Sequence, residues 1–134
     1  MKPSLQAGLT GTTQLAVDRE RSIDFMGDAA RVYATPMLLR DIEHGCRDLL
    51  LPHLESGEDS VGTRVELDHL AATPLGFLVT LNIRVSAVDG RAVTFEVEGS
   101  DGVDTICRCK HQRFVADVKK TEARILAKRQ KAGA

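Results

Sequence analysis

A glutamate and a histidine are the residues whose positions in this sequence most strongly suggest chemistry. Glu43 falls at the border of the apolar stripe of a predicted helix, and His69 is in register with the apolar residues of a predicted strand. A lone histidine on an apolar face is usually a satisfied core residue. A carboxylate and an imidazole directed toward the same cleft also form the parts of a general acid/base site, because each changes the pKa of the other.

Thr35 has two interpretations at the start of the same helix. With Pro36 at the first helical position, Thr35 is well suited to be the N-cap. A hydroxyl there also lies beside free backbone N–H groups, which favour an anion or a developing oxyanion. Thr35 and Glu43 are separated by roughly 12 Å along a helix that rises 1.5 Å per residue. If both share a site with His69, the substrate stretches between them or one residue comes from a partner subunit.

Two cysteines and a histidine raise the alternative of a metal site. Cys107, Cys109 and His111 are spaced two residues apart and therefore share one face of a predicted strand, where they resemble half of a zinc site. Neighbouring side chains on one face of a strand splay apart and no fourth ligand is evident, so we expect no metal. Cys46 lies in the helix stripe and is expected in the core.

The helix that must position Thr35 and Glu43 is predicted to begin at Pro36, after the Thr35 cap, and to end near Leu51, before Pro52. Its apolar residues recur at helical spacing. They are Leu38, Leu39, Ile42, Cys46, Leu49 and Leu50. The opposite side is expected to carry the polar residues Arg40, Asp41, His44, Arg47 and Asp48.

Most of the remaining chain is predicted to form strands. The expected strands are Gln14–Asp18, Thr63–Ala72, Phe77–Val88, Arg91–Glu98 and Val103–Val118, and Asp89-Gly90 is a strong hairpin turn signal. Strands joined by short turns are antiparallel and need a cover for their buried face. We therefore predict an α+β fold in which a curved antiparallel sheet wraps around one long central helix. One helix covers only part of such a sheet and leaves an edge open, so we expect at least a homodimer, with a tetramer as the alternative.

Length and composition limit the protein's class. The 134 residues fit one domain over 1–134, with a loose N-terminal arm over 1–12 and a basic C-terminal tail over 119–134. The formal net charge of -1 does not favour nucleic-acid binding, and no apolar run is long enough to cross a membrane. We see no signal peptide and expect three free thiols, which points to the cytoplasm. The basic tail is expected to be a solvated face, although it would also suit the phosphates of a nucleotide tail.

The chain resembles the fluoroacetyl-CoA thioesterase family of hot-dog-fold proteins. The resemblance rests on Val32-Tyr33-Ala34-Thr35, on Glu43 and on the run from Gly62 to Gly76, which contains His69-Leu70-Ala71-Ala72-Thr73-Pro74. It covers most of the chain, from about residue 30 to about residue 118. It implies a hot-dog fold and a thioesterase that releases an acyl group from coenzyme A with water. The positions that correspond to the catalytic residues of the family are Thr35, Glu43 and His69.

The resemblance also implies that the backbone of Gly62 approaches the thioester, and that no cofactor is needed beyond the CoA of the substrate. The fluoroacetyl-specific members carry lid phenylalanines before the helix, whereas Ala29 stands near the lid position here. We therefore expect a small acyl-CoA substrate without fluoroacetyl specificity. Two alternatives are a non-catalytic acyl-CoA or small-ligand binding module and a hydratase, although the Asp/His loop signature of a hydratase is not found.

Overall fold

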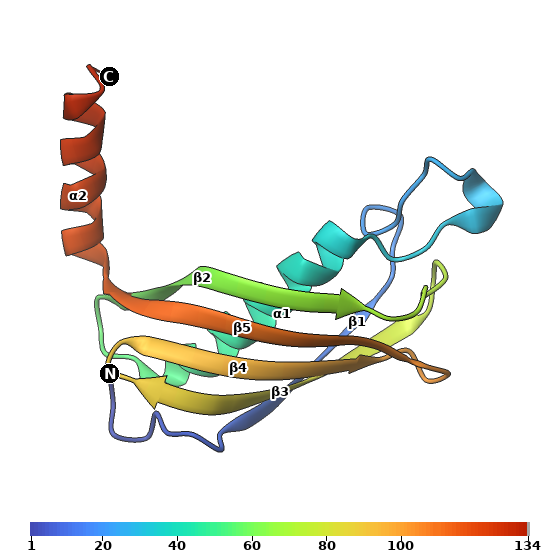
Figure 1. The fold of residues 1–134 in the computed structure, drawn as a ribbon, viewed down its shortest axis with the longest axis horizontal. Coiled ribbons are helices and arrows are strands. Elements are labelled where there is room, and N and C mark those ends of the chain that lie inside the picture. Colours follow the sequence, from blue (N-terminus) through green and yellow to red (C-terminus); the bar gives the residue numbers. More distant parts are fainter. Residues whose placement is uncertain (134) are drawn as a thin grey trace.

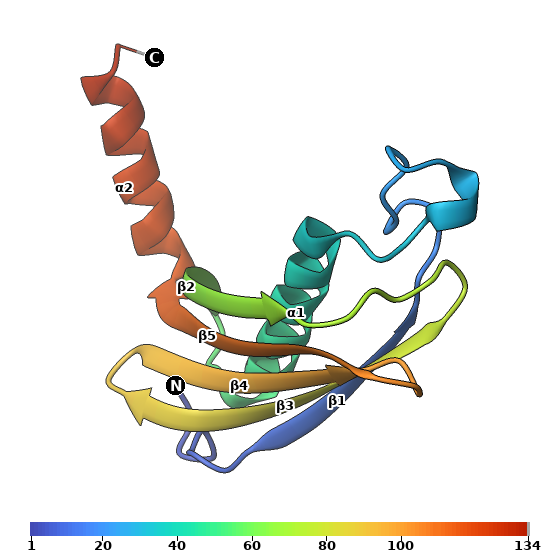
Figure 2. The ribbon, with the colours of Figure 1, turned by 45° about the vertical axis from the view of Figure 1, so that its right-hand side comes forward.

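A long helix lies against one face of a five-stranded antiparallel sheet in the computed structural model, which describes residues 1–133 (Figure 1). The helices are α1 (Thr35–Leu50) and α2 (Val118–Lys131), with short 3₁₀ turns at Asp28–Ala30 and Leu51–His53. The strands are β1 (Thr10–Ala16), β2 (Glu58–His69), β3 (Leu78–Asp89), β4 (Ala92–Ser100) and β5 (Thr105–Asp117). The expected α+β architecture, with a sheet curved around a helix, is confirmed (Figure 2).

The core lies between α1 and the inner face of the sheet. The fully buried residues of the helix are Leu38, Ile42, Cys46 and Leu50, as its apolar spacing predicted. They pack against alternate residues of β3 and β4, namely Val79, Leu81, Ile83, Val85, Val93, Phe95 and Val97. The outer face is polar, and Arg84 pairs with Glu96 across β3 and β4. One-sided burial of this kind is typical of antiparallel sheets.

The order of the strands differs from a simple meander. The sheet runs β1-β3-β4-β5-β2, so β2 and β3 follow one another in sequence without being neighbours. Residues 70–77 carry the chain from one edge of the sheet back toward the other. β2 is left as an edge strand that pairs only with β5, and its Val61 and Val65 are 51% and 36% exposed. The open edge expected from the sequence is therefore present.

The N-terminal segment is packed, so the expected loose arm over residues 1–12 is wrong. β1 already begins at Thr10, Leu5 is buried, and the Lys2 N–H donates to the His53 carbonyl at 2.9 Å. β2 likewise begins at Glu58 rather than Thr63. Its first residues pair with the end of β5, and the register shifts at a bulge between Gly62 and Arg64.

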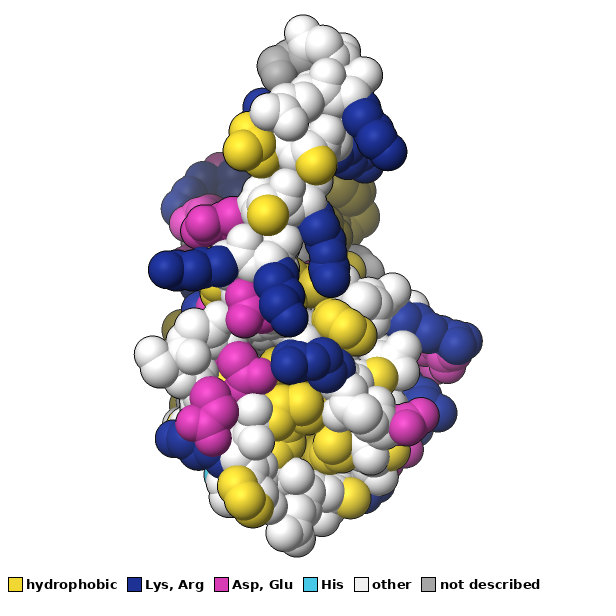
Figure 3. Space-filling model, turned by 90° about the vertical axis from the view of Figure 1, so that its left-hand side faces the viewer, with side chains coloured by type: hydrophobic (Ala, Val, Ile, Leu, Met, Phe, Trp, Pro, Cys, Tyr) yellow, Lys and Arg dark blue, Asp and Glu magenta, His cyan; other side chains and the backbone are white. Residues whose placement is uncertain are grey.

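Two segments extend past the β2 edge at opposite ends of the sheet. One is α2 and the other is formed by residues 19–34 (Figures 1 and 2). The basic tail forms α2, whose N-cap is Asp117, and this helix has no buried residue. In Figure 3 it is the column that rises above the body and carries lysine and arginine side chains. Its Ile125 and Leu126 are exposed. Within residues 1–133, no helix has the length and apolar content needed to cross a membrane.

Candidate active site

The first residue of α1 and the last residue of β2 meet through their side chains. Thr35 Oγ1 lies 2.7 Å from His69 Nδ1. The N-cap of α1 is Ala34, whose carbonyl accepts the N–H groups of Met37 and Leu38 at 3.0 and 2.9 Å. The interpretation of Thr35 as an N-cap is therefore wrong, because its hydroxyl is bonded to the imidazole. His69 lies opposite Cys107, on the inner face of the sheet, as the alternation of the strand predicted.

The surroundings of His69 favour the neutral imidazole. Burial lowers the pKa of His69, and the nearby Ala71 backbone opposes this only in part. Its Nε2 is buried and has no hydrogen-bond partner within residues 1–133. When Nδ1 carries the proton and donates it to Thr35, Nε2 keeps a free lone pair. His69 can then accept a proton near neutral pH.

Thr35 and His69 line a pocket of about 360 Å³. Its other lining residues are Ile23, Phe25, Val32, Tyr33, Ala34, Leu70, Ala71 and Ala72. A larger hollow of about 740 Å³ lies on the outer face of the sheet, among charged side chains such as Glu66, Arg84 and Lys110. It contains none of the predicted site residues, so the smaller pocket is the candidate active site.

Glu43 belongs to a second cluster, farther along α1. Its side chain is 38% exposed, and its Oε2 lies 3.4 Å from an Nη atom of Arg113. The Arg113 guanidinium is buried and also donates to the Ser60 hydroxyl at 2.8 Å and the Ser60 carbonyl at 2.9 Å. Arg113 is thus a fixed positive charge that holds the Glu43 carboxylate in place.

His111 completes this second cluster as a neutral group. Its Nδ1 lies 2.8 Å from the Arg64 carbonyl oxygen and therefore carries the proton, while Nε2 accepts from Arg113 at 3.1 Å. Burial, together with the Arg113 charge, lowers the pKa of His111. Cys107 and Cys109 share its face as buried free thiols. Residues 1–133 contain no group of three or more His, Cys, Asp or Glu residues arranged to hold a metal ion.

Gly62 lies where a side chain would strike this cluster. A Cβ atom there would be 2.8 Å from Glu43 Oε2 and 3.0 Å from His111 Cε1. Only glycine therefore lets the β2 backbone come this close to the Glu43 carboxylate.

The four predicted site residues thus form two pairs within one chain. Thr35 contacts His69, and Glu43 contacts Gly62. Along β2, Gly62 and His69 are separated by roughly 23 Å at 3.3 Å per residue, less the shortening at the bulge. No contact joins the two pairs within residues 1–133 of a single chain.

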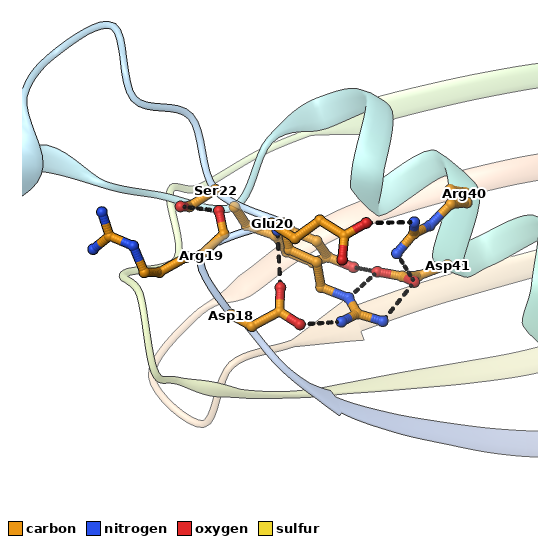
Figure 4. Close-up of polar contacts among 8 residues, drawn as sticks. Asp18, Arg19, Glu20, Ser22, Arg40 and Asp41 are labelled. Carbon is orange, nitrogen blue, oxygen red and sulfur yellow. Dashed lines mark hydrogen bonds and ion pairs between the residues drawn. The ribbon is translucent and has the colours of Figure 1, made fainter.

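Sequence reasoning missed two charged residues near the site. Asp41 was expected on the solvent side of α1 but is only 5% exposed, and it bonds to Arg21 and Tyr33 (Figure 4). Nothing in the helical period indicates this, because Arg21 comes from a distant segment. Arg113 does carry a signal, since it continues the inward register of His111 on β5.

Comparison with known proteins identifies the family. The family model of FlK, the fluoroacetyl-CoA-specific thioesterase, matches residues 17–119. The fluoroacetyl-CoA thioesterase of Streptantibioticus cattleyicolor is 31% identical over 135 residues, which span 96% of this chain and 97% of that protein. The crystal structure of a point mutant of FlK with fluoroacetate and CoA superposes with a TM-score of 0.81 and 31% identity over 87% of this chain and 99% of that one.

A thioesterase superfamily member from Thermus thermophilus superposes with a TM-score of 0.86 and 29% identity, over 98% of this chain and 99% of that one. These relatives confirm the expected hot-dog fold. The chain belongs to the fluoroacetyl-CoA-specific thioesterase family of thioester hydrolases.

Proposed function

We propose that this protein hydrolyses a small acyl-CoA thioester to the free acid and CoA, with Thr35, Glu43 and His69 as the catalytic residues. The observation that carries the proposal is the 2.7 Å contact between Thr35 and His69 beside a pocket of about 360 Å³, in a chain of the FlK family. His69 Nε2 has no hydrogen-bond partner within residues 1–133, and its free lone pair favours hydrolysis over an acyl-binding module.

Each residue has a proposed role in one addition and elimination sequence. Water adds to the thioester carbonyl carbon while the neutral imidazole of His69 accepts its proton. The bond between carbon and sulfur then breaks, and His69 returns the proton to the departing sulfur, so one water yields one acid and one thiol. Thr35 orients the imidazole, and Glu43, fixed by Arg113, holds the attacking water. No cofactor enters these steps.

The separation of the two pairs supports a site shared between two chains. β2 is an open edge with exposed Val61 and Val65. Two β2 strands from different chains can pair antiparallel, with the centre of the pairing at Val65 or Glu66. In either register, Gly62 of one chain lies opposite a residue directly next to His69 of the other chain. Glu43 of each chain then joins the Thr35–His69 pair of its copy. We propose this homodimer as the active form.

The acyl group is proposed to be small and not specifically fluoroacetyl. Ala29 is exposed within the Asp28–Ala30 turn and does not line the pocket. The pocket wall is formed instead by apolar side chains such as Phe25 and Ile23. We also propose that the protein acts in the cytoplasm, in keeping with its three free thiols.

Release of free thiol from a panel of acyl-CoAs tests the function. Wild-type protein is compared with His69→Ala and Glu43→Ala, each checked for folding by circular dichroism. His44→Ala and Asp48→Ala, exposed residues of α1, are matched controls. We expect thiol release with one or more short acyl-CoAs, loss in the two site variants and full activity in the controls. If no substrate releases thiol, the binding module is the better interpretation; undiminished activity in both site variants refutes the proposed residues.

A further inference from the structure

A buried ionic cluster joins α1 to the segment of residues 19–34 (Figure 4). Its centre is Asp41, whose carboxylate accepts from Arg21 Nε at 2.9 Å and from an Arg21 Nη atom at 3.2 Å. The Tyr33 hydroxyl donates to the same carboxylate. Burying the Asp41 carboxylate on α1 costs desolvation free energy that an apolar residue at this position would not. A contribution to stability alone therefore does not explain why an aspartate stands here.

The cluster fixes where the segment leaves the sheet and enters the helix. The Arg21 carbonyl accepts the N–H of Ala34, the N-cap residue, at 2.8 Å. The Asp18 carboxylate accepts both the Arg21 backbone N–H and its guanidinium, each at 2.8 Å. Arg21 is thus held at both its backbone and its side chain, and its guanidinium donates to the two carboxylates labelled in Figure 4, Asp18 and Asp41.

The same segment forms one wall of the candidate active site. Its residues Ile23, Phe25 and Val32 line the pocket, yet the segment extends past the sheet edge and Phe25 is 79% exposed. The facing wall, residues 70–72, is held to the sheet by the Leu70 N–H, which donates to the Ile106 carbonyl at 2.7 Å, and the next residue, Thr73, accepts the Tyr33 N–H of the outer segment at 2.8 Å. Backbone bonds to residues 73–75 hold the end of the outer segment near the helix, and the ionic cluster is its side-chain attachment to α1, so the width of the pocket depends on both.

Tyr33 connects the cluster to His69. The two rings meet edge to face, with centroids 6.5 Å apart and planes at 81°. Tyr33 is only 1% exposed, and burial beside Asp41 raises the pKa of its phenol, which stays a hydrogen-bond donor. Fixing Tyr33 through Asp41 therefore also fixes one side of the imidazole.

We propose that Arg21, Tyr33 and Asp41 form a positioning cluster that sets the width of the acyl pocket and the orientation of His69, and so selects short acyl chains. None of the three needs to touch the reacting atoms. The inference rests on the proposed thioesterase function and adds the origin of its chain-length preference.

The test compares acetyl-CoA with hexanoyl-CoA in Asp41→Asn, Arg21→Met and Tyr33→Leu. In Asp41→Asn and Arg21→Met the outer wall should loosen and admit the longer chain. We therefore expect the ratio of kcat/KM for acetyl-CoA to kcat/KM for hexanoyl-CoA to fall by roughly tenfold, a typical size for discrimination by an apolar pocket. Tyr33→Leu is expected to lower kcat about tenfold through loss of the ring contact, and Tyr33→Phe, which keeps the ring but loses the hydroxyl that donates to Asp41, is expected to lower kcat by less. Arg21→Met is the second variant should Asp41→Asn fold poorly.

Controls separate this role from a purely structural one. Arg84→Met and Glu96→Gln disrupt an ion pair on the outer face of the sheet and are expected to leave the ratio unchanged. Equal loss on both substrates in the cluster variants would overturn the proposal while leaving the thioesterase function intact. Hydrogen exchange gives a readout without activity: the Ile23 and Ala34 amides should exchange faster in Asp41→Asn. Unchanged exchange overturns the proposal whether or not the wild-type protein hydrolyses a thioester. The thioesterase function is refuted by a different result, namely that the wild-type protein hydrolyses no thioester.

Discussion

Replacing Gly62 with alanine should displace the Glu43 carboxylate without unfolding the protein. The new Cβ would be 2.8 Å from Glu43 Oε2, where an ordinary contact begins at 3.4 Å, so the carboxylate must retreat by about 0.6 Å. Glu43 is flexible and half-exposed, so it can move, but its contact with Arg113 is already 3.4 Å long and will break. Misplacement of a catalytic group by about 1 Å costs on the order of 100-fold, so we expect kcat/KM to fall between about 10- and 100-fold.

The Gly62→Ala substitution should also lower the free energy of unfolding, by an amount that depends on the contact with His111. His111 Cε1 would be 3.0 Å from the Cβ and its ring is fixed, so β2 must shift slightly, at about 1 kcal/mol of unfolding free energy. Thiol release and urea unfolding are measured for Gly62→Ala, Glu43→Ala and the double variant. Because the alanine acts through Glu43, the double variant should be no less active than Glu43→Ala alone. Full activity in Gly62→Ala, or an equal further loss in the double variant, would refute the reasoning.

The remaining predictions concern titrating groups. Burial lowers the pKa of His69, so the acid limb of kcat/KM against pH should lie below 6.5, and an inflection at or above 6.5 would contradict the neutral imidazole. Burial also lowers the pKa of His111. Since the unfolded chain then binds the protons of both histidines first, unfolding free energy should fall as pH drops below 6.5, by at most about 1.4 kcal/mol per pH unit for each histidine, and His111→Gln should reduce the slope by the His111 share. Burial raises the pKa of Cys107 to about 11 and of Cys46 to about 12, so native thiols should react with iodoacetamide roughly 100-fold more slowly than in urea, where equal rates would show them to be accessible.

Local periodicity was sufficient where a residue's environment is set by its own element. The buried stripe of α1 and the inward direction of His69 both follow from spacing within a single helix or strand. The hairpin indicated by Asp89-Gly90 likewise depends only on its neighbours. Its two turn residues are Gly90 and Arg91, one position later than predicted, and Gly90 has a positive φ of 58°.

What could not be predicted depends on residues far apart in the chain. Thr35 does not cap the helix, because its hydroxyl is bonded to the His69 imidazole, 34 residues away in the chain. Asp41 is buried because a guanidinium 20 residues earlier reaches it, and no helical period encodes that partner. The edge position of β2, which exposes the proposed dimer surface, follows from strand order, and strand order is a property of the whole sheet.

Complementation between two inactive variants tests the shared acyl-CoA thioesterase site most directly. Glu43→Ala and His69→Ala chains are unfolded together, refolded as a mixture and assayed for thiol release, with heterodimers counted by native mass spectrometry. If each site takes Glu43 from one chain and His69 from the other, one of the two sites in every heterodimer is intact, and random mixing should restore about a quarter of wild-type activity. Confirmed heterodimers with no more activity than either variant alone would contradict the shared site.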